Sequence, residues 1–447
     1  MLHRLERQRE REAESGDRAP RRGTRGRPGS RPLRASAVVS VLVCLLSTAA
    51  GWAHAGRPAA RAAAGAMPTP TASPAVSEDA RAWMESVEHS RASVPAWVDS
   101  FSDLVELLSA QPATSTAAPD RSTPGEAAHL VYLPLVSNYE LGSRRVLGSV
   151  TYVGPTTPCD NEECFDVTIK CQQLGLPDTA TLKVGSPQGP ARGTIYFAGG
   201  YDGTYFWENS GSNYASIIHQ LQAEGFRTVQ VEWHTGWWRG TANDLEGTAK
   251  LACPSATMLA FVNNNLHAEP GTPYCAEGHS NGASEIGFAI AQYGLADRLA
   301  LVLFESGPNF ARVDCGCIRD PQDPALQALF YARGGRSIIN ASLGLPVDTG
   351  ACVAQDVGFL DHFQEASLAW DTQWQYSYPG TMAAFVFGES DLGTTAVHGL
   401  YYYNRIVGAG TPLVSISVVP GAGHFVADTP QGMSTILDAL LDNCVIQ

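Results

Sequence analysis

The sequence predicts an α/β fold, a doubly wound and mostly parallel sheet with helices on both faces. Strand-like and helix-like segments alternate from about residue 193 to the end of the chain, which is the pattern of parallel strands joined by crossover helices. Hydrophobic residues make up 44% of the 447 residues and charged residues 17%, so a sizeable core can form. Polar side chains follow the ends of three predicted strands, where sheets of this class place their ligands.

The elements can be placed by their apolar patterns and by the glycines that end them. Early strands are expected at 148–153, 164–171 and 181–184, followed by strands at 193–198, 226–233, 274–279, 299–304, 382–387 and 414–419. Helices are expected from about 213 to 224, 242 to 267, 281 to 293 and 433 to 441. Residues 307–381 interrupt the alternation and are interpreted as an irregular insertion that forms a cap over the site.

The N-terminus has the composition of an export signal. Residues 1–34 carry eleven Arg and five acidic residues, and residues 35–55 carry no charge. A basic region, an apolar run and the small-x-small sequence Ala53-His54-Ala55 favour a cleaved signal peptide and a secreted protein. The alternatives are a membrane anchor, because about 20 residues can span a bilayer, and a buried core helix.

Residues 56–129 are rich in Ala, Pro, Ser and Thr and are expected to be a linker before a catalytic domain at 130–447. Within this linker, residues 96–109 have one apolar face at helical spacing. This short helix is expected to dock onto the domain or a partner. The sequence of this helix indicates no chemical role.

The charge of the chain limits which partners it can bind, and its cysteine content indicates the cellular compartment. After residue 34 the chain carries 19 basic and 39 acidic residues, so nucleic acid is an unfavourable partner for the body. Nine cysteines follow Cys44, which in an exported chain predicts up to four disulfides and one remaining thiol. Cys275, in a strand expected to be buried, is the candidate for that thiol. Cys315-Gly-Cys317 and Cys159-x4-Cys164 lack the spacing or the His partner of a zinc site, so no metal is expected.

Ser280 is the candidate nucleophile. It lies in Gly278-His279-Ser280-Asn281-Gly282, where a predicted strand passes into a helix. A serine at such a sharp turn has strained backbone geometry, and the two glycines leave room for the neighbouring strand and helix. The pentapeptide alone is a weak signal, since the chain has 44 glycines.

Two further motifs follow strand ends and strengthen this interpretation. The strand at 382–387 leads to Asp391, and the strand at 414–419 leads to His424. With these three motifs in this order, residues 193–447 resemble the α/β-hydrolase fold family, whose nucleophile elbow, acid turn and histidine loop they match. The resemblance implies that His424 acts as base and Asp391 as its orienting acid, with Glu305 and, less well, Glu389 as substitute acids.

The same resemblance implies an oxyanion hole built from backbone N–H groups. One is that of Asn281, and the second comes from Gly200 or Tyr201 in the loop after the strand at 193–198. Aromatic residues in this loop and in the loop after 226–233 are expected either to bind substrate or to serve as core or lid. They are Trp207, Trp233, Trp237 and Trp238.

These features predict a monomeric exported serine hydrolase that cleaves small or polymeric carboxylic esters through an acyl-enzyme, without a metal or organic cofactor. A lipase, a polyester depolymerase, a carbohydrate esterase or a peptidase would have the same triad in its sequence. The alternative from another class is a catalytically silent surface domain that uses the same fold for binding.

Overall fold

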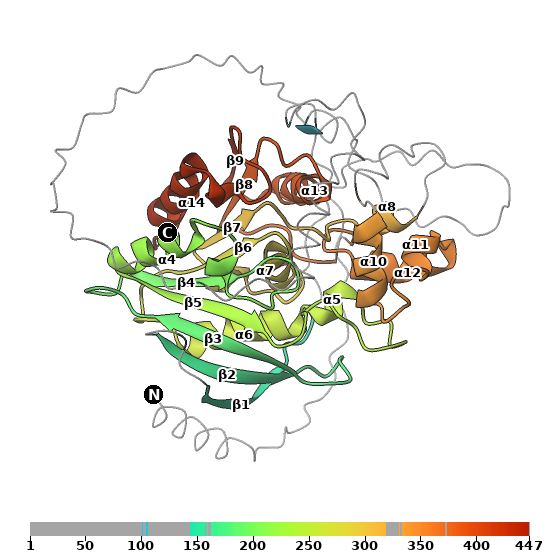
Figure 1. The fold of residues 1–447 in the computed structure, drawn as a ribbon, viewed down its shortest axis with the longest axis horizontal. Coiled ribbons are helices and arrows are strands. Elements are labelled where there is room, and N and C mark those ends of the chain that lie inside the picture. Colours follow the sequence, from blue (N-terminus) through green and yellow to red (C-terminus); the bar gives the residue numbers. More distant parts are fainter. Residues whose placement is uncertain are drawn as a thin grey trace, which may run out of the picture. The chain divides into compact units, whose positions relative to one another are not determined.

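A computed structural model describes residues 101, 104–105, 144–156, 159, 162–318, 330, 333–371 and 373–446. Its centre is a nine-stranded sheet in the order β1-β2-β3-β5-β4-β6-β7-β8-β9 (Figure 1). The strands are β1 (Ser149–Pro155), β2 (Glu163–Lys170), β3 (Asp178–Gly185), β4 (Gly193–Ala198), β5 (Phe226–Trp233), β6 (Tyr274–His279), β7 (Leu301–Glu305), β8 (Met382–Gly388) and β9 (Val414–Val419). The predicted doubly wound, mostly parallel sheet is confirmed.

The sheet has an antiparallel beginning and a parallel body. β1, β2 and β3 pair antiparallel with one another, and β3 pairs antiparallel with β5. From β5 through β4, β6, β7, β8 and β9 every pair is parallel. The carboxyl ends of β4, β6, β7, β8 and β9 therefore meet along one edge, which places their following loops beside one another.

Helices cover both faces of the parallel strands. They are α4 (Tyr214–Ala223), α5 (Gly247–Leu251), α6 (Cys253–Asn265), α7 (Asn281–Ala291), α13 (Thr394–Gly408) and α14 (Pro430–Asn443), with short 3₁₀ turns at Trp207–Asn209, Ala296–Arg298, Val357–Phe359 and Val426–Asp428. Alternate residues of β4 divide between two apolar clusters: Ile195 and Phe197 pack with α4 and α14, and Tyr196 and Ala198 pack with α6, α7 and α13. This alternation is what a strand buried on both faces requires.

The predicted elements agree with the structure most closely among the parallel strands of the sheet. The expected ranges 193–198, 226–233 and 414–419 coincide with β4, β5 and β9. The single helix expected over 242–267 is instead α5 and α6, which meet at Ala252. The helix α13 was not expected from the sequence.

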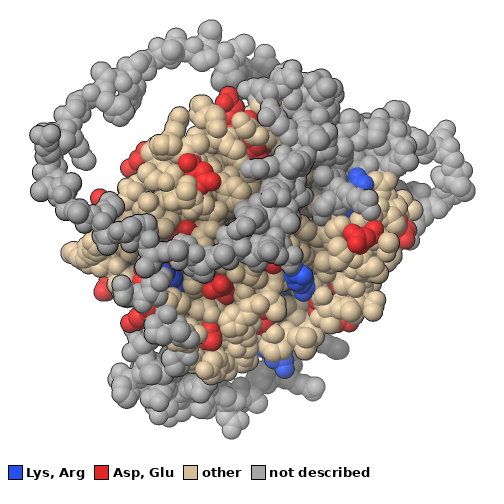
Figure 2. All heavy atoms as spheres, in the orientation of Figure 1, with Lys and Arg blue, Asp and Glu red and all other residues tan. Residues whose placement is uncertain are grey.

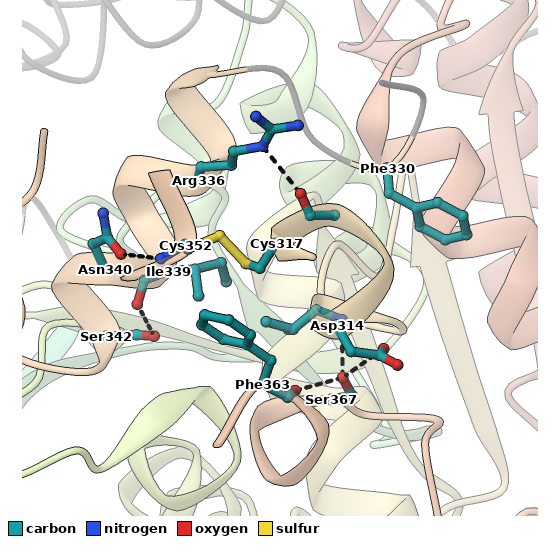
Figure 3. Close-up of a disulfide and its surroundings, with 12 residues drawn as sticks. Asp314, Cys317, Phe330, Arg336, Ile339, Asn340, Ser342, Cys352, Phe363 and Ser367 are labelled. Carbon is teal, nitrogen blue, oxygen red and sulfur yellow. Dashed lines mark hydrogen bonds between the residues drawn. A yellow bond between two sulfur atoms is a disulfide. The ribbon is translucent and has the colours of Figure 1, made fainter. Parts of the chain in front are cut away.

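The insertion between β7 and β8 is helical rather than irregular. It contains α8 (Val313–Cys317), α10 (Arg333–Ser342), α11 (Ala351–Ala354) and α12 (Leu360–Ala366), which gather beside the sheet (Figure 1). The disulfide Cys317–Cys352 joins α8 to α11 against Ile339 and Phe363 (Figure 3). The Cys352 N–H donates to Asn340 Oδ1 at 2.8 Å, so the bridge and α10 support each other.

Four disulfides form among the described residues, as the cysteine count predicts, but the expected thiol is wrong. Cys275 is bonded to Cys444, and the other bridges are Cys159–Cys164, Cys171–Cys253 and Cys317–Cys352. Cys315 lies outside these bridges. The side chain of Cys275 points to the α14 face of the sheet, where Cys444 ends that helix, so its apolar surroundings include a second sulfur.

The predicted signal segment 1–55 lies outside the described residues, as does most of the linker 56–129. In the expected helix at 96–109, the described residues Phe101, Leu104 and Val105 are helical. Phe101 and Leu104 are buried, and the ring of Phe101 lies 5.3 Å from that of Phe387 in β8. In the part of the chain that the structure describes, no helix has the length and apolarity to cross a membrane.

Candidate active site

Ser280 lies at the junction of β6 and α7 in a left-handed backbone conformation, with φ 56° and ψ −116°. This region is unfavourable for a residue with a side chain and is found at functional turns. A Cβ on Gly278 would lie 2.5 Å from the carbonyl carbon of Gly282, and one on Gly282 would overlap the carbonyl oxygen of Ala198. Both glycines are therefore required by close backbone approach.

The structure brings Ser280, His424 and Asp391 together in one hydrogen-bonded chain. Ser280 Oγ lies 3.0 Å from His424 Nε2, and His424 Nδ1 lies 3.0 Å from Asp391 Oδ2. Ser280, His424 and Asp391 are 0%, 6% and 5% exposed. Asp391 follows β8 and His424 follows β9, so the three side chains converge at the edge where the parallel strands end.

Thr395 in the first turn of α13 supports the acid. Its Oγ1 donates to Asp391, with both carboxylate oxygens at 3.0 Å, and lies 3.4 Å from His424 Nδ1. The hydroxyl and the imidazole thus both hold the carboxylate, and both contact Oδ2. Thr395 was not singled out from the sequence, although its position four residues after Asp391 is the signal that could have identified it.

Glu305, the substitute acid, is engaged elsewhere. Its Oε1 accepts hydrogen bonds from Tyr214 Oη at 2.6 Å and from the backbone N–H groups of Val426 at 3.1 Å and Ala427 at 3.4 Å. Glu305 therefore fixes the backbone that follows His424 rather than the imidazole itself. Glu389 is bound at the surface by the Gly421 N–H at 3.0 Å.

A second buried acid lies beside Glu305. Burial first, and then the neighbouring Glu305 carboxyl group, raise the pKa of Glu277 well above its usual range. Burial raises the pKa of Glu305 to about 8, against the hydrogen bonds that lower it. The pair therefore holds at least one proton at neutral pH, because two adjacent carboxylates in a buried site cannot both ionise.

His279, the last residue of β6, packs against His424. Its Nε2 lies 3.3 Å from the His424 carbonyl oxygen, and the two rings are 5.0 Å apart. Burial and the nearby His424 hold the pKa of His279 well below its usual range, against the hydrogen bond to the His424 carbonyl. His279 is therefore a neutral packing partner of His424.

The candidate oxyanion residues lie on two loops that the structure joins. Asn281 Nδ2 donates to the Tyr201 carbonyl oxygen at 2.7 Å, which links the elbow to the loop after β4. Tyr201 has a φ of 49°, and a Cβ on Gly200 would lie 2.7 Å from His279 Nδ1. Gly200 thus lies directly beside the elbow, and its lack of a side chain permits that approach.

The four tryptophans are nearly fully buried, at 0% to 3% exposure. Trp207 packs on Phe197 and Tyr214, in the apolar cluster between the sheet and the helices α4 and α14. Trp233 Nε1 donates to Glu285 Oε2 at 3.0 Å. These two side chains have the core role that the sequence left as an alternative to substrate binding.

Trp237 and Trp238 contact the segments that follow β4 and β7. Trp238 Nε1 donates to the Tyr201 carbonyl at 3.1 Å, and its ring contacts the Tyr201 ring edge to face at 5.8 Å. The Trp237 ring contacts Phe310 at 5.9 Å. These two tryptophans therefore support the loop after β4 and the start of the insertion.

Asn309, which the sequence did not indicate, also reaches the nucleophile. Its Nδ2 lies 3.2 Å from Ser280 Oγ. Asn309 follows β7, the strand that pairs with β6. A polar residue after the strand next to the nucleophile strand is the signal that could have identified it.

A serine elbow after β6, a loop from β4 beside it, and an acid and a histidine after β8 and β9 together define the architecture. The fold is α/β-hydrolase-like. This fold assignment is based on the strand order and on the placement of these groups.

Comparisons with known proteins match this chain to solved structures of low sequence identity. No known family profile matches the chain, and no curated protein matches it. Among solved structures, it is similar to a lipase in its open form (14% identity, 60% of this chain and 94% of that one, TM-score 0.38). It is also similar to brefeldin A esterase, a bacterial homologue of human hormone-sensitive lipase (16%, 66% and 80%, TM-score 0.41), and to a thermostable carboxyl esterase from Bacillus coagulans (13%, 62% and 97%, TM-score 0.38).

Proposed function

We propose that this protein is a serine hydrolase that cleaves carboxylic esters through an acyl-enzyme. The observation that carries the proposal is the continuous chain from Ser280 Oγ through His424 to Asp391, with both links at 3.0 Å and Ser280 in a strained elbow. A serine hydroxyl is a weak nucleophile until a neighbouring base removes its proton, and this chain supplies that base.

In the proposed reaction, His424 Nε2 takes the Oγ proton as Oγ bonds to the ester carbonyl carbon. Asp391 keeps the imidazole in the tautomer with hydrogen on Nδ1 and stabilises its positive form. The carbonyl oxygen gains negative charge, which the backbone N–H groups of Asn281 and of Gly200 or Tyr201 are placed to stabilise. His424 then protonates the leaving alcohol, and water repeats the sequence to release the acid.

The test is covalent labelling by a fluorophosphonate, which reacts only with an activated serine. The wild-type protein is expected to label and Ser280→Ala is expected not to. Labelling of neither would favour the catalytically silent binding domain, and equal labelling of both would move the nucleophile elsewhere. A panel of p-nitrophenyl esters of rising chain length, acetylated xylan, an insoluble polyester and a peptide amide then separates the ester classes from a peptidase.

We further propose that the protein acts outside the cell as a monomer. The four disulfides favour an oxidising compartment, and the basic, apolar and small-residue order of residues 1–55 favours export. The N-terminal residue of the secreted form tests this. Cleavage predicts a start at Gly56, whereas retention of residues 35–55 would indicate a membrane anchor.

A further inference from the structure

We propose that Asn309 is a further catalytic residue, whose side-chain amide donates to Ser280 Oγ and so directs the serine hydrogen toward His424. This inference rests on the proposed serine-hydrolase function. It adds a fourth side chain to the reaction centre, contributed by the segment that begins the insertion after β7.

Asn309 is fixed against the helix that follows the nucleophile. Its backbone N–H donates to Ser284 Oγ in α7 at 2.8 Å, and the residue is only 4% exposed. From this position, Nδ2 lies 3.2 Å from Ser280 Oγ and 2.5 Å from Asn281 Oδ1. The amide thus touches the reacting atom as well as the side chain of the next residue.

The hydrogen-bond network determines which end of each amide faces which neighbour. The Tyr201 carbonyl can only accept a hydrogen bond, so the atom of Asn281 at 2.7 Å from it must be Nδ2. The other end of that amide, Oδ1, then faces Asn309 and requires a donor. Asn309 must therefore present Nδ2 to this oxygen, and the same Nδ2 faces Ser280 Oγ.

This orientation determines the direction of the serine hydrogen. The Asn309 amide has two hydrogens, and they match two acceptors, Asn281 Oδ1 and Ser280 Oγ. Because Oγ accepts from Asn309, its own hydrogen is left for His424 Nε2 at 3.0 Å. The resting site is thus arranged for proton transfer before substrate arrives.

During attack, Asn309 neither gains nor loses a proton. The Oγ–H bond breaks as the proton passes to His424 Nε2, an Oγ lone pair forms the bond to the carbonyl carbon, and the carbonyl π pair moves onto its oxygen. Negative charge passes through Oγ while this happens. The amide hydrogen bond to Oγ stabilises that charge in a buried site, where such bonds are stronger than in water.

The experiment compares Asn309→Ala and Asn309→Asp with wild type on one p-nitrophenyl ester. Removal of the donor in Asn309→Ala is expected to lower kcat by about 10²-fold with KM little changed, as for other preorganised donors at a reacting centre. Asn309→Asp has nearly the same shape but offers only acceptors when ionised. It would draw the serine hydrogen away from His424, so its kcat is expected to fall below that of Asn309→Ala.

A second readout separates this role from a structural one. The ionised carboxylate of the Asn309→Asp variant adds a negative charge near His424, so the acid limb of its kcat/KM profile is expected to move to higher pH. The alanine variant is expected to leave that limb in place. This shift reports that residue 309 lies beside His424, whereas a residue that only supports the fold would lower kcat in step with the melting temperature in both variants.

Asn265→Ala is the matched control, because Asn265 Nδ2 donates to the Phe261 carbonyl within α6, away from the site. It is expected to retain wild-type kcat. If Asn309→Ala fails to fold, the near-isosteric Asn309→Asp carries the test through its kcat and its pH profile. An active wild type with unchanged kcat and pH profile in the Asn309 variants overturns the role of Asn309 alone, whereas a wild type that neither labels nor hydrolyses any ester overturns the proposed function.

Discussion

At the scale of single residues, the structure separates the three candidate acids by their contacts. Asp391 contacts His424 Nδ1, Glu305 binds backbone N–H groups after the histidine, and Glu389 binds the Gly421 N–H. Asp391→Asn is expected to lower kcat by about 10⁴-fold, because the amide stabilises the wrong imidazole tautomer. Steady-state kinetics on an activated ester measures this. Glu389→Gln is the control and is expected to keep kcat, and near-normal turnover in Asp391→Asn would assign the role to another acid.

Thr395 offers a finer test of the same carboxylate. Thr395→Val keeps the shape but removes the hydroxyl that donates to both oxygens of Asp391. The variant is expected to lose about tenfold in kcat, since one hydrogen bond to a charged group contributes about 1.5–3 kcal/mol and part of it acts in the transition state. Thr395→Ser restores the donor and is expected to recover most of the activity. Equal losses in both variants would indicate a packing effect.

At the scale of elements, the buried acid pair couples β6 and β7 to the histidine loop. The pKa of Glu305 is about 8 in the folded protein against an ordinary value of 4.5, so between these values the folded state holds a proton that the unfolded state has lost. Stability therefore falls as pH rises through this range. Glu305→Gln is neutral at every pH and can still accept from Tyr214, Val426 and Ala427 through its oxygen.

Thermal unfolding of both proteins at about pH 5 and about pH 9 tests this effect. The two melting temperatures are expected to be similar at the lower pH, and Glu305→Gln is expected to melt higher at the upper pH. A parallel pH dependence in wild type and variant would show that Glu305 is ionised in the folded protein. Glu389→Gln, whose carboxylate is exposed, is the matched control.

The elements that sequence reasoning located best are those with the simplest pattern. β4, β5 and β9 are rich in apolar or β-branched residues, each lies beside a glycine or proline, such as Gly225 before β5 and Pro420 after β9, and their ends agree with the structure. The sequence did not predict α13, because this segment has two β-branched residues, Thr394 and Thr395, at its start, three tyrosines in the middle and Gly399 within it. Such residues have weak helix propensity, and here burial against β8 outweighs it.

Part of the site could be predicted from the sequence, because local sequence determines which residues follow the strands. Ser280, Asp391 and His424 follow strand ends, so local sequence places them on one edge of the sheet. Asn309 also follows a strand end, but it and Thr395 reach the site through side-chain directions that depend on how β7 and α13 pack. The partner of Cys275 is 169 residues away, at the end of α14, and only tertiary structure brings the two sulfurs together.

At the scale of the whole molecule, two features stand out: the excess of acidic side chains and the disulfide cross-links. The described surface carries more acidic than basic side chains on the face in Figure 2, consistent with 39 acidic and 19 basic residues after residue 34. Two of the disulfides connect the sheet to helices that cover it: Cys171–Cys253 joins the end of β2 to α6, and Cys275–Cys444 joins β6 to the end of α14.

The Cys275–Cys444 bridge is therefore expected to contribute most to stability. It closes a separation of 169 residues, against 5 for Cys159–Cys164. Loop-closure entropy predicts about 5 kcal/mol for the long bridge and about 2 kcal/mol for the short one. Cys275→Ala with Cys444→Ala should lower the free energy of unfolding in urea by about 3 kcal/mol more than the paired alanine variant of Cys159 and Cys164. Equal losses would mean that native packing around the sulfurs, rather than the constraint on the unfolded chain, determines what each bridge contributes.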